Sequence, residues 1–154
     1  GHGSTFTILL PALLEGLAVG STGARLDAPL DTETVLLVED QRDVMRLARL
    51  ALERHGYTVL TAQSGASAVE LSDSYAGTIY LLVTDVVMPD LGGRYVADVL
   101  RRSRPEIKIL FMSGYTNDAV VRHGVSNQVH DFLQKPFTPS ILARKVRAVL
   151  DAAN

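Results

Sequence analysis

The chain has 154 residues, which is enough for one domain of ordinary size with an additional segment. Its 47% hydrophobic and 21% charged residues are typical of a domain with a true core and a hydrated surface. Cysteine does not occur, which excludes disulfides, thiolate metal sites and thiol catalysis and is compatible with a reducing, cytoplasmic setting. A formal net charge of −2 gives no reason to expect nucleic-acid binding through bulk electrostatics.

The N-terminal part, residues 1–33, differs from the rest in composition and in its lack of regular periodicity. Its most apolar stretch, residues 8–19, is too short to span a bilayer and is interrupted by Pro11 and Glu15. This stretch also lacks the basic leader of a signal peptide, so we expect no membrane contact by this chain. Residues 16–33 are rich in Gly, Ala, Asp and small polar residues without a sustained period, which is typical of a linker.

From Thr34 onward, short apolar runs alternate with segments of helical periodicity. The run at residues 35–38 is continuous, as expected of a strand that is buried on both faces. An amphipathic helix is predicted to follow it and to end near Gly56, a residue type suited to the C-terminus of a helix. The residues predicted to face inward in this helix are Val44, Leu47, Ala48, Ala51 and Leu52.

The same alternation continues to the C-terminal end. Further strands are predicted at residues 57–61, 79–84, 107–112 and 129–133. Further helices are predicted after an N-cap at Ser64, over residues 95–102 and 117–123, and after Thr138 and Pro139. Five strands alternating with five helices indicate parallel βα units in a three-layer, doubly wound α/β domain.

Polar residues follow the predicted strands, at the edge of the sheet where ligands gather in this class of fold. Glu39 and Asp40 follow the first strand, Asp85 the third, Ser113 the fourth and Lys135 the fifth. Taken singly, each of them is explained as a turn, a helix cap or a hydrated side chain. Taken together, the carboxylates indicate a cation site, because clustered carboxylates repel one another unless a cation lies among them. Oxygen ligands without cysteine or a histidine cluster favour a hard ion such as Mg²⁺.

Four segments carry a specific resemblance, namely VLLVEDQRDV, TDVVMPDLGG, FMSGYT and LQKPF. Their order and spacing are similar to those of the receiver domains of response regulators, over about residues 34–150. The resemblance implies a flavodoxin-like, five-stranded parallel sheet in the order 2-1-3-4-5 with five helices, in which strands 1, 3 and 4 are neighbours. It also implies a cis peptide bond before Pro136.

The same resemblance implies how a phosphoryl group is accepted. Asp85 resembles the phospho-acceptor, a carboxylate nucleophile that forms an acyl phosphate. Asp40, Asp85 and the backbone carbonyl of Val87 would bind Mg²⁺ or Mn²⁺ directly. Glu39 would reach the ion through water, since Mg²⁺ keeps part of its hydration shell.

Further residues would contact the phosphoryl group or transmit its presence. Lys135 and the hydroxyl group of Ser113 would bind phosphoryl oxygens. Movement of Ser113 towards the phosphate would let Phe132 turn inward, although an ordinary core phenylalanine is an equally good explanation of this residue. We expect Phe132 to be mostly buried even without phosphate. Tyr115 and Val87 would control the access of water to the site.

The segment GHGSTFTILLP is similar to the last glycine box and terminal strand of a histidine-kinase ATP-binding domain. We therefore predict a remnant of that domain at residues 1–15, a linker at 16–33 and a receiver domain at 34–154. The chain would then come from a hybrid sensor histidine kinase; the alternative is a vector-derived start followed by an apolar linker. The expected partners are a histidine kinase or a phosphotransfer domain, as phosphodonor or acceptor, and homodimerisation is left open.

Two other functions remain open at the level of sequence. A small α/β phosphatase with an aspartate nucleophile would carry a second Asp two residues after the nucleophile, where this chain has Val87. A degenerate receiver would act only by binding proteins, but Asp40, Asp85, Ser113 and Lys135 are all present. The leading interpretation is a receiver that catalyses its own phosphorylation and dephosphorylation without being a turnover enzyme.

Overall fold

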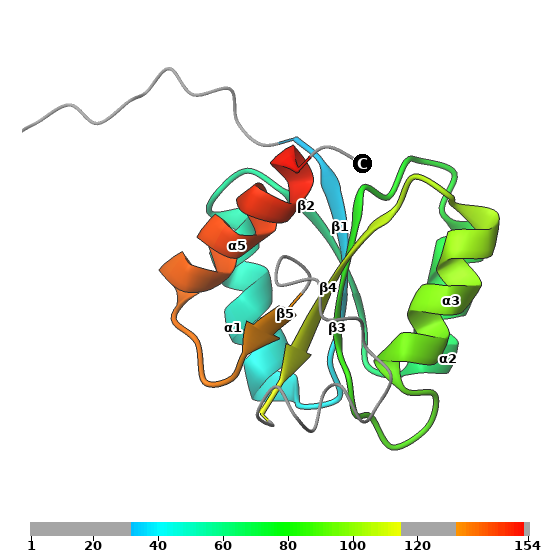
Figure 1. Ribbon diagram of the computed structural model, residues 1–154, viewed down its shortest axis with the longest axis horizontal. Coiled ribbons are helices and arrows are strands. Elements are labelled where there is room, and N and C mark those ends of the chain that lie inside the picture. Colours follow the sequence, from blue (N-terminus) through cyan, green and yellow to red (C-terminus); the bar gives the residue numbers. More distant parts are fainter. Residues whose placement is uncertain (1–31, 115–131, 153–154) are drawn as a thin grey trace, which may run out of the picture.

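The computed structural model describes residues 32–114 and 132–152 (Figure 1). Within these ranges the strands are β1 Thr34–Val38, β2 Thr58–Ala62, β3 Leu81–Asp85, β4 Lys108–Ser113 and β5 Phe132–Gln134. The helices are α1 Arg42–Glu53, α2 Gly65–Ser74, α3 Gly93–Ser103 and α5 Pro139–Asp151. Each strand overlaps its predicted position. The helix expected over residues 117–123 lies outside the described residues.

All five strands form one parallel sheet in the order β2-β1-β3-β4-β5. Helices α1 and α5 pack together on one face, and α2 and α3 pack together on the other (Figure 1). Helices lie on both faces because right-handed crossovers take the chain outward in two directions from β1. This arrangement confirms the predicted three-layer, doubly wound, flavodoxin-like fold.

The central strands β1 and β3 are buried at every position, because they lie in the middle of the sheet between two layers of helices. Side chains of β1 alternate between the faces. Leu36 and Val38 belong to the apolar cluster under α2 and α3, whereas Val35 and Leu37 belong to the cluster under α1 and α5. A strand in this position needs apolar residues on both faces, which explains the continuous run in the sequence.

The residues predicted to cap helices, namely Ser64, Thr138 and Gly56, lie at helix ends in the structure. The Ser64 hydroxyl group accepts a hydrogen bond from the N–H of Ser67 (3.1 Å) in a capping box at the start of α2. The Thr138 hydroxyl group accepts one from the N–H of Ile141 (3.3 Å) at the start of α5. Gly56, after α1, has a φ of 95°, a left-handed conformation that glycine adopts without strain.

One residue predicted to face inward in α1 is placed differently. Leu47 is 47% exposed, whereas Ala48, Ala51 and Leu52 are buried. Successive residues of an α-helix are rotated by about 100°, so Leu47 lies beside the buried stripe and not within it. Helical spacing shows that a stripe exists but does not show where its edge falls.

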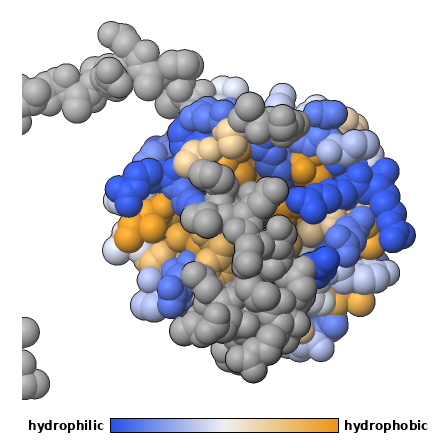
Figure 2. All heavy atoms as spheres, viewed as in Figure 1, coloured by the Kyte–Doolittle hydropathy of each residue, from blue (hydrophilic) through white to orange (hydrophobic). Residues whose placement is uncertain are grey.

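Figure 2 shows one face of the molecule, where polar residues make up much of the visible described surface and apolar side chains appear between them. Single exposed apolar residues are normal for a folded domain. Within residues 32–114 and 132–152, no helix is both long and apolar enough to cross a membrane.

Arg104, which follows α3, holds the end of α2 in place through hydrogen bonds of its side chain. Its guanidinium group donates to the backbone carbonyls of Ser72 (2.8 Å), Tyr75 (2.7 Å) and Gly77 (2.9 Å). It also donates to the hydroxyl group of Ser72 (3.1 Å), a residue that is almost fully buried. The last carbonyls of a helix have no partner within the helix, so one side chain satisfies several groups that would otherwise be unpaired.

Arg104→Met is expected to lower the free energy of unfolding by about 2–3 kcal/mol, because it leaves two partly buried carbonyls and the partly buried hydroxyl group of Ser72 without this donor. Arg104→Lys should recover little of this loss, since one ammonium group cannot reproduce the planar fork of the guanidinium group. Urea denaturation followed by circular dichroism measures the change. Arg101→Met, at an exposed position of α3, is the matched control and should cost less than about 0.5 kcal/mol. Equal costs for the Arg101 and Arg104 variants would contradict the prediction.

Candidate functional site

The carboxyl ends of β1, β3, β4 and β5 meet at one edge of the sheet. The polar residues at these ends are Glu39 and Asp40 after β1, Asp85 and Ser113 as the last residues of β3 and β4, and Lys135 after β5. Backbone hydrogen bonds continue past the strands, from the N–H of Glu39 to the last residue of β2 (3.1 Å) and from the N–H of Lys135 to Ser113 (2.7 Å). The sheet itself therefore positions these residues.

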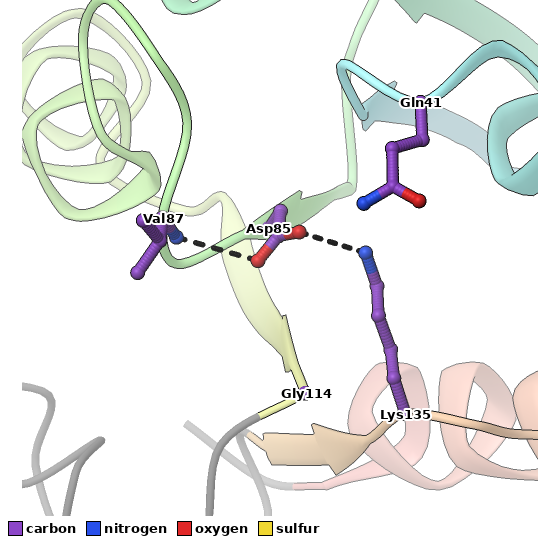
Figure 3. Close-up of a pocket in the computed structure, with 5 residues that line it drawn as sticks. All are labelled: Gln41, Asp85, Val87, Gly114 and Lys135. Atoms are coloured by element: carbon purple, nitrogen blue, oxygen red, sulfur yellow. Dashed lines mark hydrogen bonds and ion pairs between the residues drawn. The ribbon is translucent and has the colours of Figure 1, made fainter.

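Lys135 bridges two of the carboxylates. Its Nζ lies 2.5 Å from Glu39 Oε2 and 2.7 Å from Asp85 Oδ2, and the second contact is drawn in Figure 3. The Glu39 side chain is fully buried, and the Lys135 and Asp85 side chains are 15% and 11% exposed. The ammonium group thus offsets part of the negative charge that collects at this edge of the sheet.

Burial and ion pairing act in opposite directions on the pKa values of this pair. Burial raises the pKa of Glu39 above its usual 4.5, and this effect prevails over the lowering effect of Lys135. Burial by itself would lower the pKa of Lys135, but hydrogen bonds to Asp85 and Glu39 prevail and raise it above the usual 10.5. Lys135 therefore carries its positive charge throughout the neutral pH range.

The other oxygens of these two carboxylates accept backbone hydrogen bonds. The N–H of Val87 donates to Asp85 Oδ1 (3.3 Å), and the N–H of Gln41 donates to Glu39 Oε1 (3.2 Å). Asp85 is therefore oriented with one oxygen towards Lys135 and the other towards the loop that follows β3 (Figure 3).

Glu39, Asp40 and Asp85 form an acidic cluster that could hold a metal ion. Each offers an oxygen atom, and these atoms lie within 4.8 Å of one another. Asp40 Oδ1 is buried and has no hydrogen-bond partner in the described structure, which is unusual for a charged oxygen. Three carboxylates beside a single ammonium group leave excess negative charge, and a hard cation with oxygen ligands would balance it.

An open cavity of about 340 Å³ gives access to Asp85. Figure 3 shows the residues that line it, namely Gln41, Asp85, Val87, Gly114 and Lys135. Val87 is 42% exposed, and a Cβ atom added at Gly114 would have no atom within 4 Å. A small ligand can therefore reach Asp85 from solvent, with Lys135 beside it.

A family model described as the response regulator receiver domain matches residues 35–147. The chain belongs to this family. It is also similar to the sensor kinase CckA of Brucella abortus (strain 2308), with 38% identity over 98% of the chain. The receiver chain spans 17% of the length of that kinase.

Solved structures show the same likeness. A receiver domain from the hybrid histidine kinase CckA is 34% identical, with a TM-score of 0.64 that covers 77% of this chain and 99% of the other. A response regulator receiver protein from Sinorhizobium medicae WSM419 is 30% identical, with a TM-score of 0.69 that covers 80% of this chain and 98% of the other. Both agree with the five-stranded parallel sheet described above.

The structure describes two of the three remaining residues predicted for the receiver site, Ser113 and Phe132. Ser113 is buried at the end of β4. Phe132, the first residue of β5, is partly buried and packs against the core cluster under α2 and α3, in keeping with the expectation that it is mostly buried without phosphate. The peptide bond between Lys135 and Pro136 is cis, as expected. Tyr115 lies outside the described residues, so its role stays a prediction.

Two residues that line the cavity, Gln41 and Gly114, had no role in the sequence interpretation. Each directly follows a predicted site residue, and this adjacency was the available signal. Neither residue type is a nucleophile, an acid or a base, because one side chain is an uncharged amide and the other is absent.

Proposed function

We propose that this receiver domain accepts a phosphoryl group from a phosphohistidine onto Asp85 in two-component signalling. The main support is the position of Asp85, with one oxygen 2.7 Å from Lys135 Nζ and its side chain lining an open cavity. A carboxylate oxygen attacks phosphorus, the bond from phosphorus to the imidazole nitrogen breaks, and its electron pair stays on the imidazole. The product is an acyl phosphate on Asp85.

Lys135 and Ser113 serve the transferred group. The ammonium group pairs with phosphoryl oxygens and offsets the charge that spreads over them during transfer. The hydroxyl group of Ser113 donates to a further phosphoryl oxygen and is drawn towards it. Phe132 then turns into the space that Ser113 leaves, which carries the signal to the surface around β5. Tyr115 and Val87 control the access of water.

The cation at the acidic cluster is Mg²⁺ or Mn²⁺, which would neutralise phosphoryl oxygens when bound. Asp40, Asp85 and the backbone carbonyl of Val87 would hold it directly. The buried and unpartnered Asp40 Oδ1 supports this assignment. Glu39 would reach the ion through water, since Mg²⁺ keeps part of its hydration shell.

The partners follow from the parent protein. Similarity to the sensor kinase extends over 98% of the chain, whereas the family model covers residues 35–147. This difference supports a hybrid sensor histidine kinase as parent, with a remnant of its ATP-binding domain at 1–15, a linker at 16–33 and the receiver at 34–154. The phosphodonor or acceptor is then a histidine kinase or phosphotransfer domain in the cytoplasm, and a homodimer would use the surface of the helix predicted over residues 117–123, β5 and α5.

Incubation with Mg²⁺ and phosphoramidate, whose phosphorus–nitrogen bond resembles that of phosphohistidine, is expected to add one phosphoryl group per chain. Intact-mass spectrometry measures the addition, and chelation of Mg²⁺ should prevent it. A phosphorylated histidine kinase is the second donor. No uptake from either donor would contradict the proposal. Continuous release of phosphate without a phosphorylated chain would instead favour a phosphatase.

A further inference from the structure

Gln41 lines the cavity that gives access to Asp85, and its side chain does not cap helix α1. It is the N-cap residue of α1, with φ −82° and ψ 109°, but its side chain makes no capping hydrogen bond. The backbone is held on both sides, because its N–H donates to Glu39 (3.2 Å) and its carbonyl accepts from Met45 (2.9 Å). The side chain is exposed and has no hydrogen-bond partner among the described residues.

The Gln41 side chain faces the cavity that contains Asp85. Figure 3 shows its carboxamide directed towards the Lys135 ammonium group. The side chains of three other lining residues offer no acceptor, since Lys135 only donates, Val87 is apolar and Gly114 has no side chain. Among the described lining residues, Gln41 and Asp85 are therefore the two whose side chains can accept a hydrogen bond.

Hydrolysis of an acyl phosphate needs such an acceptor. The attacking water must present a lone pair to phosphorus, so its hydrogen atoms must point to acceptors. One Asp85 oxygen is then part of the acyl phosphate bond, and a lysine cannot receive a hydrogen bond. In phosphoryl-transfer enzymes of another class, a glutamine carboxamide orients the attacking water.

We propose that the Gln41 carboxamide orients the water that hydrolyses the phosphoryl group on Asp85, an inference that rests on the proposed phosphoryl acceptance. Its carbonyl oxygen accepts a hydrogen bond from the water, and its NH₂ group donates to a phosphoryl oxygen. The water oxygen attacks phosphorus in line with the bond to Asp85. That bond breaks, its electron pair returns to the carboxylate, and the proton of the water leaves with inorganic phosphate. The amide takes no proton and acts through position.

Gln41→Met removes the carboxamide while keeping the length of the side chain, and is expected to lengthen the lifetime of the Asp85 phosphate by about tenfold. The full chain is phosphorylated with phosphoramidate and Mg²⁺, the donor is removed, and the phosphorylated fraction is followed by intact mass. The rate of phosphorylation is measured on the same variant, and the loss of phosphate is expected to slow much more than its uptake, because water attacks phosphorus only in the loss step. Gln41→Ala also lacks the carboxamide and should lengthen the lifetime as well.

Gln63→Met is the matched control, because Gln63 is an exposed glutamine after β2 that does not line the cavity. Its phosphate lifetime is expected to equal that of the wild type. If the wild-type chain takes up no phosphoryl group, the proposed function itself fails. If uptake is normal and the Gln41 variants lose phosphate as fast as the wild type or faster, only the role of Gln41 is overturned.

Discussion

Asp85→Asn is expected to abolish phosphoryl uptake while the domain stays folded. The asparagine amide keeps the shape of the side chain but has no anionic oxygen that could attack phosphorus. Incubation with phosphoramidate and Mg²⁺, followed by intact-mass spectrometry, should show only the unmodified chain. The same incubation should convert the wild type to a species with one phosphoryl group.

The fold is expected to tolerate this change because Asp85 belongs to a crowded set of carboxylates. Its oxygen lies within 4.8 Å of those of Glu39 and Asp40, and removing one negative charge reduces their repulsion. The lost ion pair acts in the other direction, but Lys135 keeps Glu39 as a partner at 2.5 Å. We expect the free energy of unfolding, measured by urea denaturation, to stay within about 1 kcal/mol of the wild type.

Asp98→Asn is the matched control for the loss of uptake. Asp98 is exposed on α3, and among the described residues its ion pair is a long one with Arg94, at 4.0 Å. This variant should take up the phosphoryl group like the wild type. Equal uptake by the Asp85 and Asp98 variants would mean that another residue accepts the phosphoryl group, and the proposed chemistry at Asp85 would be wrong.

The fold and the placement of the site could be predicted because both depend on short-range patterns. The continuous run at residues 35–38 marks a central strand, and parallel strands bring their carboxyl ends to one edge of a sheet. The polar residues after those strands were therefore expected together. The exposed position of Leu47 could not be predicted, since it depends on how α1 sits against α5 and the sheet.

The pairing within the site depends on side-chain directions that no sequence pattern contains. Lys135 and Glu39 are separated by 96 residues, and which carboxylates the ammonium group reaches follows only from the packed structure. The direction of the Gln41 side chain is a similar case, because a glutamine at an N-cap can point to the helix, to solvent or to a pocket. The site residues could therefore be identified from the sequence, whereas their contacts depend on how the side chains pack in the folded structure.

Lys135→Met is expected to impair both phosphorylation and stability. The methionine side chain keeps most of the length but has no charge to offset the phosphoryl oxygens, so the rate of uptake should fall by about 10²–10³-fold. Glu39 is fully buried and would lose its counter-ion. Removing one partner of a buried ion pair leaves an uncompensated charge, and we expect the free energy of unfolding to fall by about 2–4 kcal/mol in the presence of a chelator.

The loss of stability is expected to depend on pH through Glu39. Burial already raises the pKa of Glu39 above 4.5, and without Lys135 the pKa should rise further. The folded state then holds this proton more tightly than the unfolded state, so the free energy of unfolding falls as the pH rises above 4.5. The deficit of Lys135→Met relative to the wild type should therefore be largest near neutral pH and shrink below pH 4.5, where protonated Glu39 needs no counter-ion.

Urea denaturation of the wild type and of Lys135→Met, at neutral pH and below pH 4.5, measures the stability deficit of the variant at each pH value. Arg102→Met removes an exposed positive charge at the end of α3 and should show neither the deficit nor its pH dependence. A deficit of equal size at both pH values would mean that the Lys135 ammonium group does not compensate buried Glu39. The two site variants together separate the nucleophile from its counter-ion, because Asp85→Asn removes a charge from a crowded cluster whereas Lys135→Met removes the charge that offsets it.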